Sequence, residues 1–138
     1  MPQVKLIMGV KGSGKTKQFI DLVTHALEGE KGDIVCLEKG SRLTYDLPHA
    51  VRLIESAEYG FNNYEFLKGF LSGLRAGNYD ITHVFIDSVL RMIDVPLDER
   101  AEEFFDWCEA FGQKHGIKFT MMVSADVAAA TENIRKYF

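Results

Sequence analysis

The sequence has few of the residues from which a disulfide-stabilised fold or a metal centre is built. Its two cysteines, Cys36 and Cys108, both lie in apolar segments, so we interpret them as buried thiols rather than as a bridge or a metal site. Its four histidines show no metal-ligand spacing, and His83 is most simply a strand-end residue. The composition therefore predicts a reducing, cytoplasmic setting.

Long apolar runs and a strong excess of basic charge are absent as well. No segment is long enough to span a bilayer, and the first predicted strand begins so early that we expect no signal peptide. The formal net charge of −4 argues against a nucleic-acid partner, because a polyanion requires a basic face. Without internal repeats, low-complexity tracts or linkers, the 138 residues, of which 46% are hydrophobic, predict a single domain over residues 1–138.

The most informative segment is the glycine-rich run at residues 9–16, which matches the pattern G-x-x-x-x-G-K-[ST] without a mismatch. It consists of Gly9, Val10, Lys11, Gly12, Ser13, Gly14, Lys15 and Thr16. An apolar run precedes it and a helical pattern follows it, which is the strand–loop–helix setting that this motif requires. Its glycines let backbone N–H groups turn inward toward phosphate oxygens, beside the positive end of the following helix. We therefore predict a nucleotide site in which Lys15 binds the β- and γ-phosphates and Thr16 ligates Mg²⁺.

Short apolar runs alternate with amphipathic patterns along the chain. Strands are expected at residues 4–8, 33–37, 51–54, 83–87 and 118–123, and helices at about residues 14–27, 62–77 and 98–115 and near the C-terminus. The second helix is expected to begin at Asn62 with a capping box to Glu65. Its expected buried face comprises Phe66, Leu67, Phe70, Leu71 and Leu74. Residues 38–49 and 88–99 are expected to be loops. This alternation predicts a three-layer α/β/α sandwich around a mainly parallel sheet of about five strands.

Ligands of such sheets bind at the carboxyl ends of the strands, where the sequence places two acidic residues. Asp87 ends an apolar strand, the Walker B pattern whose carboxylate holds magnesium; a helix N-cap is the alternative. Glu38 also follows a strand and is a candidate base for hydrolysis, with a solvated loop glutamate as the alternative. Ser88 follows Asp87 at a position where many ATPases have a glutamate, so that arrangement is absent.

Together these residues resemble the RecA-like branch of the P-loop NTPases. The loop at residues 9–16 and the pair Asp87-Ser88 correspond to its Walker motifs, Glu38 to its base, and Ser124 to the end of its sensor strand. The resemblance implies a P-loop nucleotide-binding domain that binds ATP and Mg²⁺ and hydrolyses ATP slowly, with Lys15 and Glu38 as catalytic residues. The chain is also similar to short stand-alone bacterial ATP-binding proteins of unassigned role, some carrying a twitching-motility label.

The consequence of nucleotide binding stays open between three hypotheses. ATP hydrolysis is the first, and a nucleotide-responsive binding module, favoured by Ser88, is the second. A small-molecule kinase is the third and the weakest, because its only candidate lid, residues 94–100, is short and acidic. Arg91 or Arg100 can act as a finger on a neighbouring subunit's phosphate or be an ordinary surface arginine. Uncovered sheet edges would permit a homo-oligomer or a protein partner.

Overall fold

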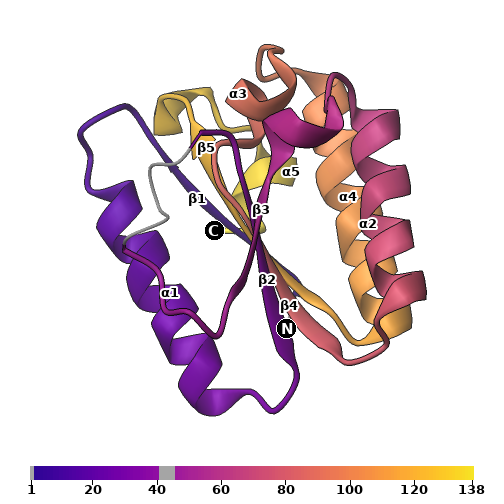
Figure 1. The fold of residues 1–138 in the computed structure, drawn as a ribbon. Coiled ribbons are helices and arrows are strands. Elements are labelled where there is room, and N and C mark those ends of the chain that lie inside the picture. The colour runs from indigo at the N-terminus through magenta and orange to yellow at the C-terminus, as the bar shows by residue number, and fades with distance from the viewer. Residues whose placement is uncertain (1, 41–45) are drawn as a thin grey trace.

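The computed structural model describes residues 2–40 and 46–138, and within these ranges five strands form one sheet (Figure 1). The strands are β1 (Val4–Gly9), β2 (Asp33–Glu38), β3 (Arg52–Glu55), β4 (Ile81–Ile86) and β5 (Lys118–Ser124). Their order in the sheet is β1-β5-β4-β2-β3, and every neighbouring pair is parallel. The carboxyl ends of all five strands therefore lie at the same edge of the sheet, where ligands of parallel α/β sheets bind.

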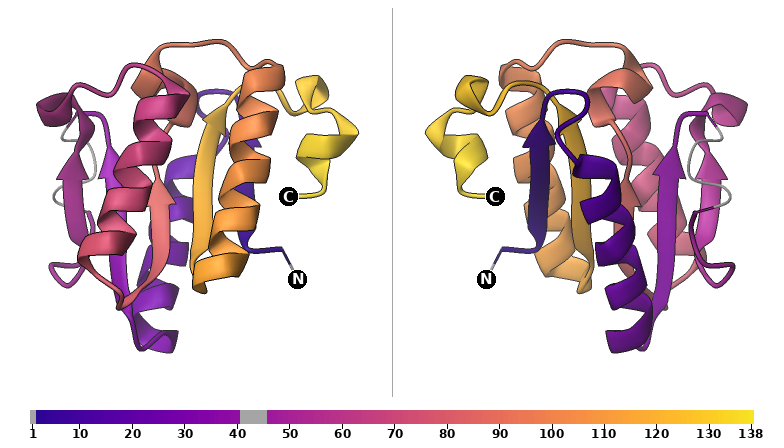
Figure 2. Two further views of the ribbon diagram at one scale, coloured as in Figure 1. Left: turned by 90° about the vertical axis from the view of Figure 1, so that its right-hand side faces the viewer. Right: turned by 90° about the vertical axis from the view of Figure 1, so that its left-hand side faces the viewer.

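Helices cover both faces of this sheet (Figure 2). The α-helices are α1 (Lys15–Gly29), α2 (Tyr64–Gly77), α3 (Val89–Ile93), α4 (Glu99–His115) and α5 (Glu132–Arg135), with 3-10 turns at Ser56–Tyr59 and Val127–Ala129. Helix α1 buries Phe19 and Val23 against one face, while α2 and α4 pack on the other. The predicted α/β class, the number of strands and the parallel sheet with helices on both sides are confirmed.

The two edges of the sheet differ. At the β1 edge, Tyr137 follows α5 and its carbonyl accepts a hydrogen bond of 2.8 Å from the Leu6 amide. Figure 2 shows this C-terminal segment, in yellow, beside β1. The opposite edge is the short strand β3. Within residues 2–40 and 46–138, no helix is both long and apolar enough to cross a membrane.

The start of α2 corrects one sequence prediction. Asn63, not Asn62, is the N-cap, and its Oδ1 accepts a hydrogen bond of 2.7 Å from the Phe66 amide. The capping box is therefore wrong, and Glu65 instead binds the Lys68 ammonium at 3.1 Å. The side chain of Phe66, predicted to be buried, is 40% exposed.

Packing explains this difference in the face of α2. Tyr64, Leu67 and Leu71 are its buried residues, and Phe70 and Leu74 are partly buried at the core margin. Because the apolar face of α2 runs along these five positions, Phe66 lies at the edge of the buried face, where it is partly exposed to solvent.

A second correction concerns His83, which lies within β4 rather than at its end because the strand begins at Ile81. Its imidazole is buried, with Nδ1 2.7 Å from Glu30 Oε2 and Nε2 2.8 Å from Thr120 Oγ1. Burial lowers the pKa of His83, and the hydrogen bond with Glu30 opposes this shift. The network joins the C-cap of α1 to strands β4 and β5.

The cysteine prediction is confirmed for both residues. Cys36 and Cys108 are buried and free of disulfides. Burial is the main cause that raises the pKa of each thiol, because it disfavours the charged thiolate. Each behaves as a small apolar core residue.

Candidate phosphate-binding site

The loop between β1 and α1 has the backbone conformation that its glycines allow. Gly12 and Gly14 have φ angles of 85° and 87°, in the left-handed region that L side chains rarely adopt. At Gly9 the requirement is steric, because a Cβ atom there would lie 2.5 Å from Ser13 Oγ. The Ser13 amide donates a hydrogen bond of 3.2 Å to the Val10 carbonyl and closes the turn. The glycine positions of the motif are therefore needed for the shape of this loop.

The side chain of Lys15 lies across the loop that precedes it. Its ammonium donates a hydrogen bond of 3.0 Å to the Val10 carbonyl, so Nζ is close to the loop backbone. Gly14 is the N-cap of α1 and supplies no side chain, and the first turn of the helix contains no acidic residue. The amides that begin the helix are therefore uncapped by a side chain and present partial positive charge beside the Lys15 ammonium.

A cavity of about 720 Å³ opens in front of the loop. It is lined by Lys11, Gly12, Gly14, Lys15, Thr16, Ser88, Arg91, Met122 and Ser124. Three of these residues are cations and none is a carboxylate, so the wall of the cavity is electropositive. Five of the eight residues of the predicted loop line it, and the others come from α3, its N-cap and the end of β5.

The sheet order brings the two predicted acidic residues to neighbouring strand ends. Asp87 follows β4, and its amide donates a hydrogen bond of 2.9 Å to the carbonyl of Leu37 in β2. Both carboxylates are close enough to Cys36 to raise the pKa of its thiol. Their side chains are buried, since Asp87 is 1% and Glu38 is 2% exposed.

These positions decide between some of the sequence-based alternatives. The solvated loop glutamate is wrong, because Glu38 is the buried last residue of β2. The N-cap of α3 is Ser88, so Asp87 is not the cap residue of that helix. The hydroxyl of Ser88 donates a hydrogen bond of 2.9 Å to Asp87 Oδ1. Neither Asp87 nor Glu38 lines the cavity itself, whereas Ser88, the hydrogen-bond partner of Asp87, does.

A magnesium ion at this edge would depend on few protein ligands. Among the residues that the structure describes, no cluster of three or more His, Cys, Asp or Glu side chains could hold a metal. Mg²⁺ commonly uses one or two protein oxygens together with phosphate oxygens and water. Thr16 on the cavity wall and Asp87 behind Ser88 fit that limited donor set.

Helix α3 is a feature that the sequence prediction missed, since residues 88–99 were expected to be a loop. Four of its five residues, Val89, Leu90, Met92 and Ile93, are buried, and the fifth is Arg91. The helix lies between Ser88 and Asp94, whose φ angles of 51° and 55° are in the left-handed region. For non-glycine residues this conformation costs on the order of 1 kcal/mol each. The apolar run itself was the available signal for the helix.

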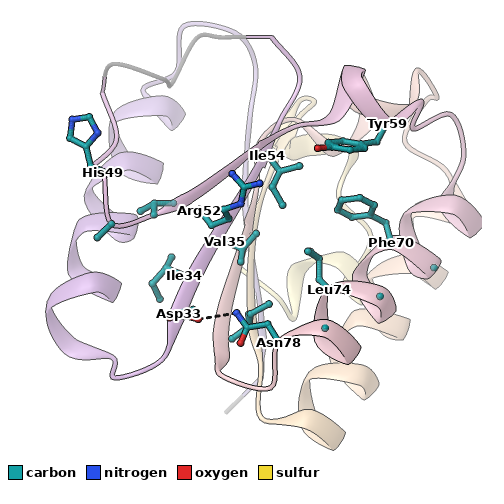
Figure 3. A pocket seen from close by; sticks show the side chains of 16 residues that line it. Asp33, Ile34, Val35, His49, Arg52, Ile54, Tyr59, Phe70, Leu74 and Asn78 are labelled. Carbon is teal, nitrogen blue, oxygen red and sulfur yellow. Dashed lines mark hydrogen bonds between the residues drawn. The ribbon is translucent and has the colours of Figure 1, made fainter.

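A larger cavity of about 1020 Å³ lies elsewhere, between β2, β3 and α2 (Figure 3). Tyr59 and Phe70 lie at one end of it, and the Asp33–Asn78 hydrogen bond of 2.8 Å lies at the other. None of the predicted site residues lines this cavity. We assign the candidate site to the smaller cavity, because there cations, hydroxyls and a glycine-shaped loop meet at the strand ends.

No protein-family model matches the chain, and no curated protein matches it either. The assignment of the site therefore rests on the residues and on their geometry.

Proposed function

We propose that this chain is a P-loop nucleotide-binding protein of the RecA-like type that binds ATP with Mg²⁺ and hydrolyses it slowly. The main support for this proposal is the loop at residues 9–16. Its two glycines in the left-handed conformation and the side chain of Lys15 line an electropositive cavity at the start of α1. That combination of backbone shape, positive charge and helix start suits a polyphosphate.

Each residue in the proposal has a role that follows from its position. Lys15 would exchange the Val10 carbonyl for the β- and γ-phosphates, and Thr16, in the first turn of α1, would ligate Mg²⁺. Asp87, fixed by the Ser88 hydroxyl, would complete the magnesium shell directly or through water. Glu38 would orient the attacking water as general base.

Burial supports the proposed role of Glu38. A carboxylate that is 2% exposed is shielded from bulk solvent, and as the last residue of β2 Glu38 lies at the same edge of the parallel sheet as the phosphate-binding loop. A shielded carboxylate at that edge can orient a single water for attack, as a general base must.

A nucleotide-responsive binding module is the second candidate, and one observation favours it. The cavity is not lined by Glu38, so an ATP molecule bound there can lie out of reach of the base. The kinase hypothesis gains less support. Arg100 does not line the cavity, and its guanidinium is held by Asp98 at 2.9 Å at the start of α4.

Single-turnover measurements with labelled ATP separate these candidates. We expect the wild type to release phosphate into water, and Glu38→Gln to bind ATP with unchanged affinity but to lose hydrolysis. If both proteins bind ATP equally and neither hydrolyses it, the enzyme proposal fails and the binding module remains. Transfer of the label to a metabolite instead of water would favour the kinase.

A further inference from the structure

Arg91 lies in the candidate site of its own chain, whereas the sequence suggested a finger for a neighbouring subunit or an ordinary surface arginine. It lines the same cavity as Lys15 and Thr16. Helix α3, which carries it, begins directly after Asp87 and Ser88 at the end of β4. The side chain therefore reaches the cavity from the wall formed by β4 and α3, while Lys15 reaches it from the wall formed by β1 and α1.

The guanidinium of Arg91 is held by a neutral partner. Its Nη2 donates a hydrogen bond of 3.0 Å to the Lys39 carbonyl, and the Lys39 ammonium donates one of 3.4 Å to the Arg91 carbonyl. A guanidinium has five N–H donors in a planar fork that matches phosphate oxygens. A phosphate is a stronger acceptor than a peptide carbonyl, because its charge strengthens each hydrogen bond.

The other charged residues that line this cavity are also positive. Lys11 and Lys15 are the other cations of the lining, and no lining residue is a carboxylate. Each added negative charge on a ligand in this cavity increases its attraction to these three cations. ATP carries one phosphate more than ADP, so a cation of the lining that comes from α3 rather than from the loop can distinguish the two nucleotides.

The hydrogen bonds between Arg91 and Lys39 also attach Arg91 to the backbone next to Glu38, the candidate base. Lys39 follows Glu38 directly, and the next amide, that of Gly40, donates a hydrogen bond of 3.0 Å to Glu55 Oε1. The segment after Glu38 is thus held between Arg91 on α3 and Glu55 on β3. Withdrawal of the guanidinium from the Lys39 carbonyl would break one of the three hydrogen bonds that hold this segment to Arg91 and Glu55.

We propose that Arg91 binds the terminal phosphate of ATP within its own chain and thereby makes the site prefer ATP to ADP. On binding, its guanidinium exchanges the Lys39 carbonyl for phosphate oxygens, so the backbone beside Glu38 responds to the presence of the third phosphate. This inference rests on the proposed nucleotide site and adds to it the residue that reads the length of the phosphate chain.

Equilibrium binding of ATP and ADP, each with Mg²⁺, tests the inference in wild type, Arg91→Ala and Arg91→Lys. We expect Arg91→Ala to weaken ATP binding by about 10- to 100-fold, the range for loss of charge-assisted hydrogen bonds. ADP binding should change by less than about threefold, which also shows that the variant is folded. Arg91→Lys should keep part of the preference, because it retains the charge but loses the fork. The matched control is Arg100→Ala, which removes an exposed arginine outside the cavity and should leave both affinities unchanged.

The results that would contradict the proposed function differ from those that would contradict only the role of Arg91. If the wild type binds neither nucleotide, the proposed function itself fails. If the wild type binds ATP and Arg91→Ala keeps the wild-type preference, or loses both nucleotides equally, only the role of Arg91 is overturned. Recovery of ATP affinity on mixing Arg91→Ala with Lys15→Ala would show that the arginine acts on a neighbouring chain and would overturn the assignment within one chain.

Discussion

The close approach of Ser13 to Gly9 allows a quantitative test of the phosphate-binding loop. A Cβ atom at position 9 would lie 2.5 Å from Ser13 Oγ and 3.3 Å from Ser13 Cβ. The Ser13 hydroxyl can rotate away from an added methyl group, but Ser13 Cβ cannot, so the loop backbone must shift by a few tenths of an ångström. The hydrogen bond from the Ser13 amide to the Val10 carbonyl resists that shift. Overpacking of this kind costs about 1–3 kcal/mol. If the shift is confined to the loop, Gly9→Ala should weaken ATP binding by roughly 5- to 150-fold.

A double-mutant cycle identifies the cause of that loss. Ser13→Ala removes the Oγ atom at 2.5 Å but leaves the Cβ contact at 3.3 Å, so Gly9→Ala/Ser13→Ala should recover only a small part of the affinity. Gly29→Ala at the other end of α1 is the matched control, because a Cβ there meets nothing within 4 Å. Calorimetric titration with Mg²⁺-ATP measures all four variants. Wild-type affinity in Gly9→Ala, or full recovery in the double variant, would refute the account in which the loop backbone must shift.

Three other substitutions test the packing away from the loop. Gly112→Ala should destabilise the protein by about 1–3 kcal/mol, because its Cβ would collide with the Ile117 carbonyl. Gly73→Ala in α2 has open space around its Cβ and should stabilise by about 0.5–1 kcal/mol; urea titrations at one pH measure both changes. Burial lowers the pKa of His83 below its ordinary 6.5, so the neutral form is favoured in the folded chain and stability should fall as the pH decreases below 6.5. Urea midpoints between pH 8 and 5 should therefore fall more for wild type than for His83→Gln, and equal slopes would contradict the role of His83.

Much of the fold could be predicted because its elements are strongly patterned. The middle of β2 is wholly apolar and that of β5 is apolar except for Thr120, as in strands covered on both faces. Helix α4 begins and ends where Asp98 and Gly116 cap it. The start of α2 was predicted one residue too early, at Asn62 instead of Asn63, since both are good caps and no local pattern distinguishes them. Helix α3 was missed because its five residues are too few for an apolar periodicity, and its flanking residues, Ser88 and Asp94, are as typical of loops as of helix ends.

The candidate site, too, could be predicted only in part from the sequence. The loop could be anticipated because left-handed backbone at Gly12 and Gly14 is a local property of the motif. The burial of Glu38 depends on the order of the strands, with β2 enclosed between β3 and β4, and no local pattern contains that information. The position of Arg91 depends on the turn of α3 toward the loop, which is likewise a consequence of tertiary packing.

Binding of ATP to the purified chain tests the central claim most directly. Calorimetric titration should show one ATP per chain in the presence of Mg²⁺, with affinity reduced by roughly 10- to 100-fold in Lys15→Ala. Lys17→Ala is the matched control, because this exposed lysine lies outside the cavity, and it should bind as the wild type does. Absence of saturable binding in the wild type, or equal affinity in wild type and Lys15→Ala, would contradict the account.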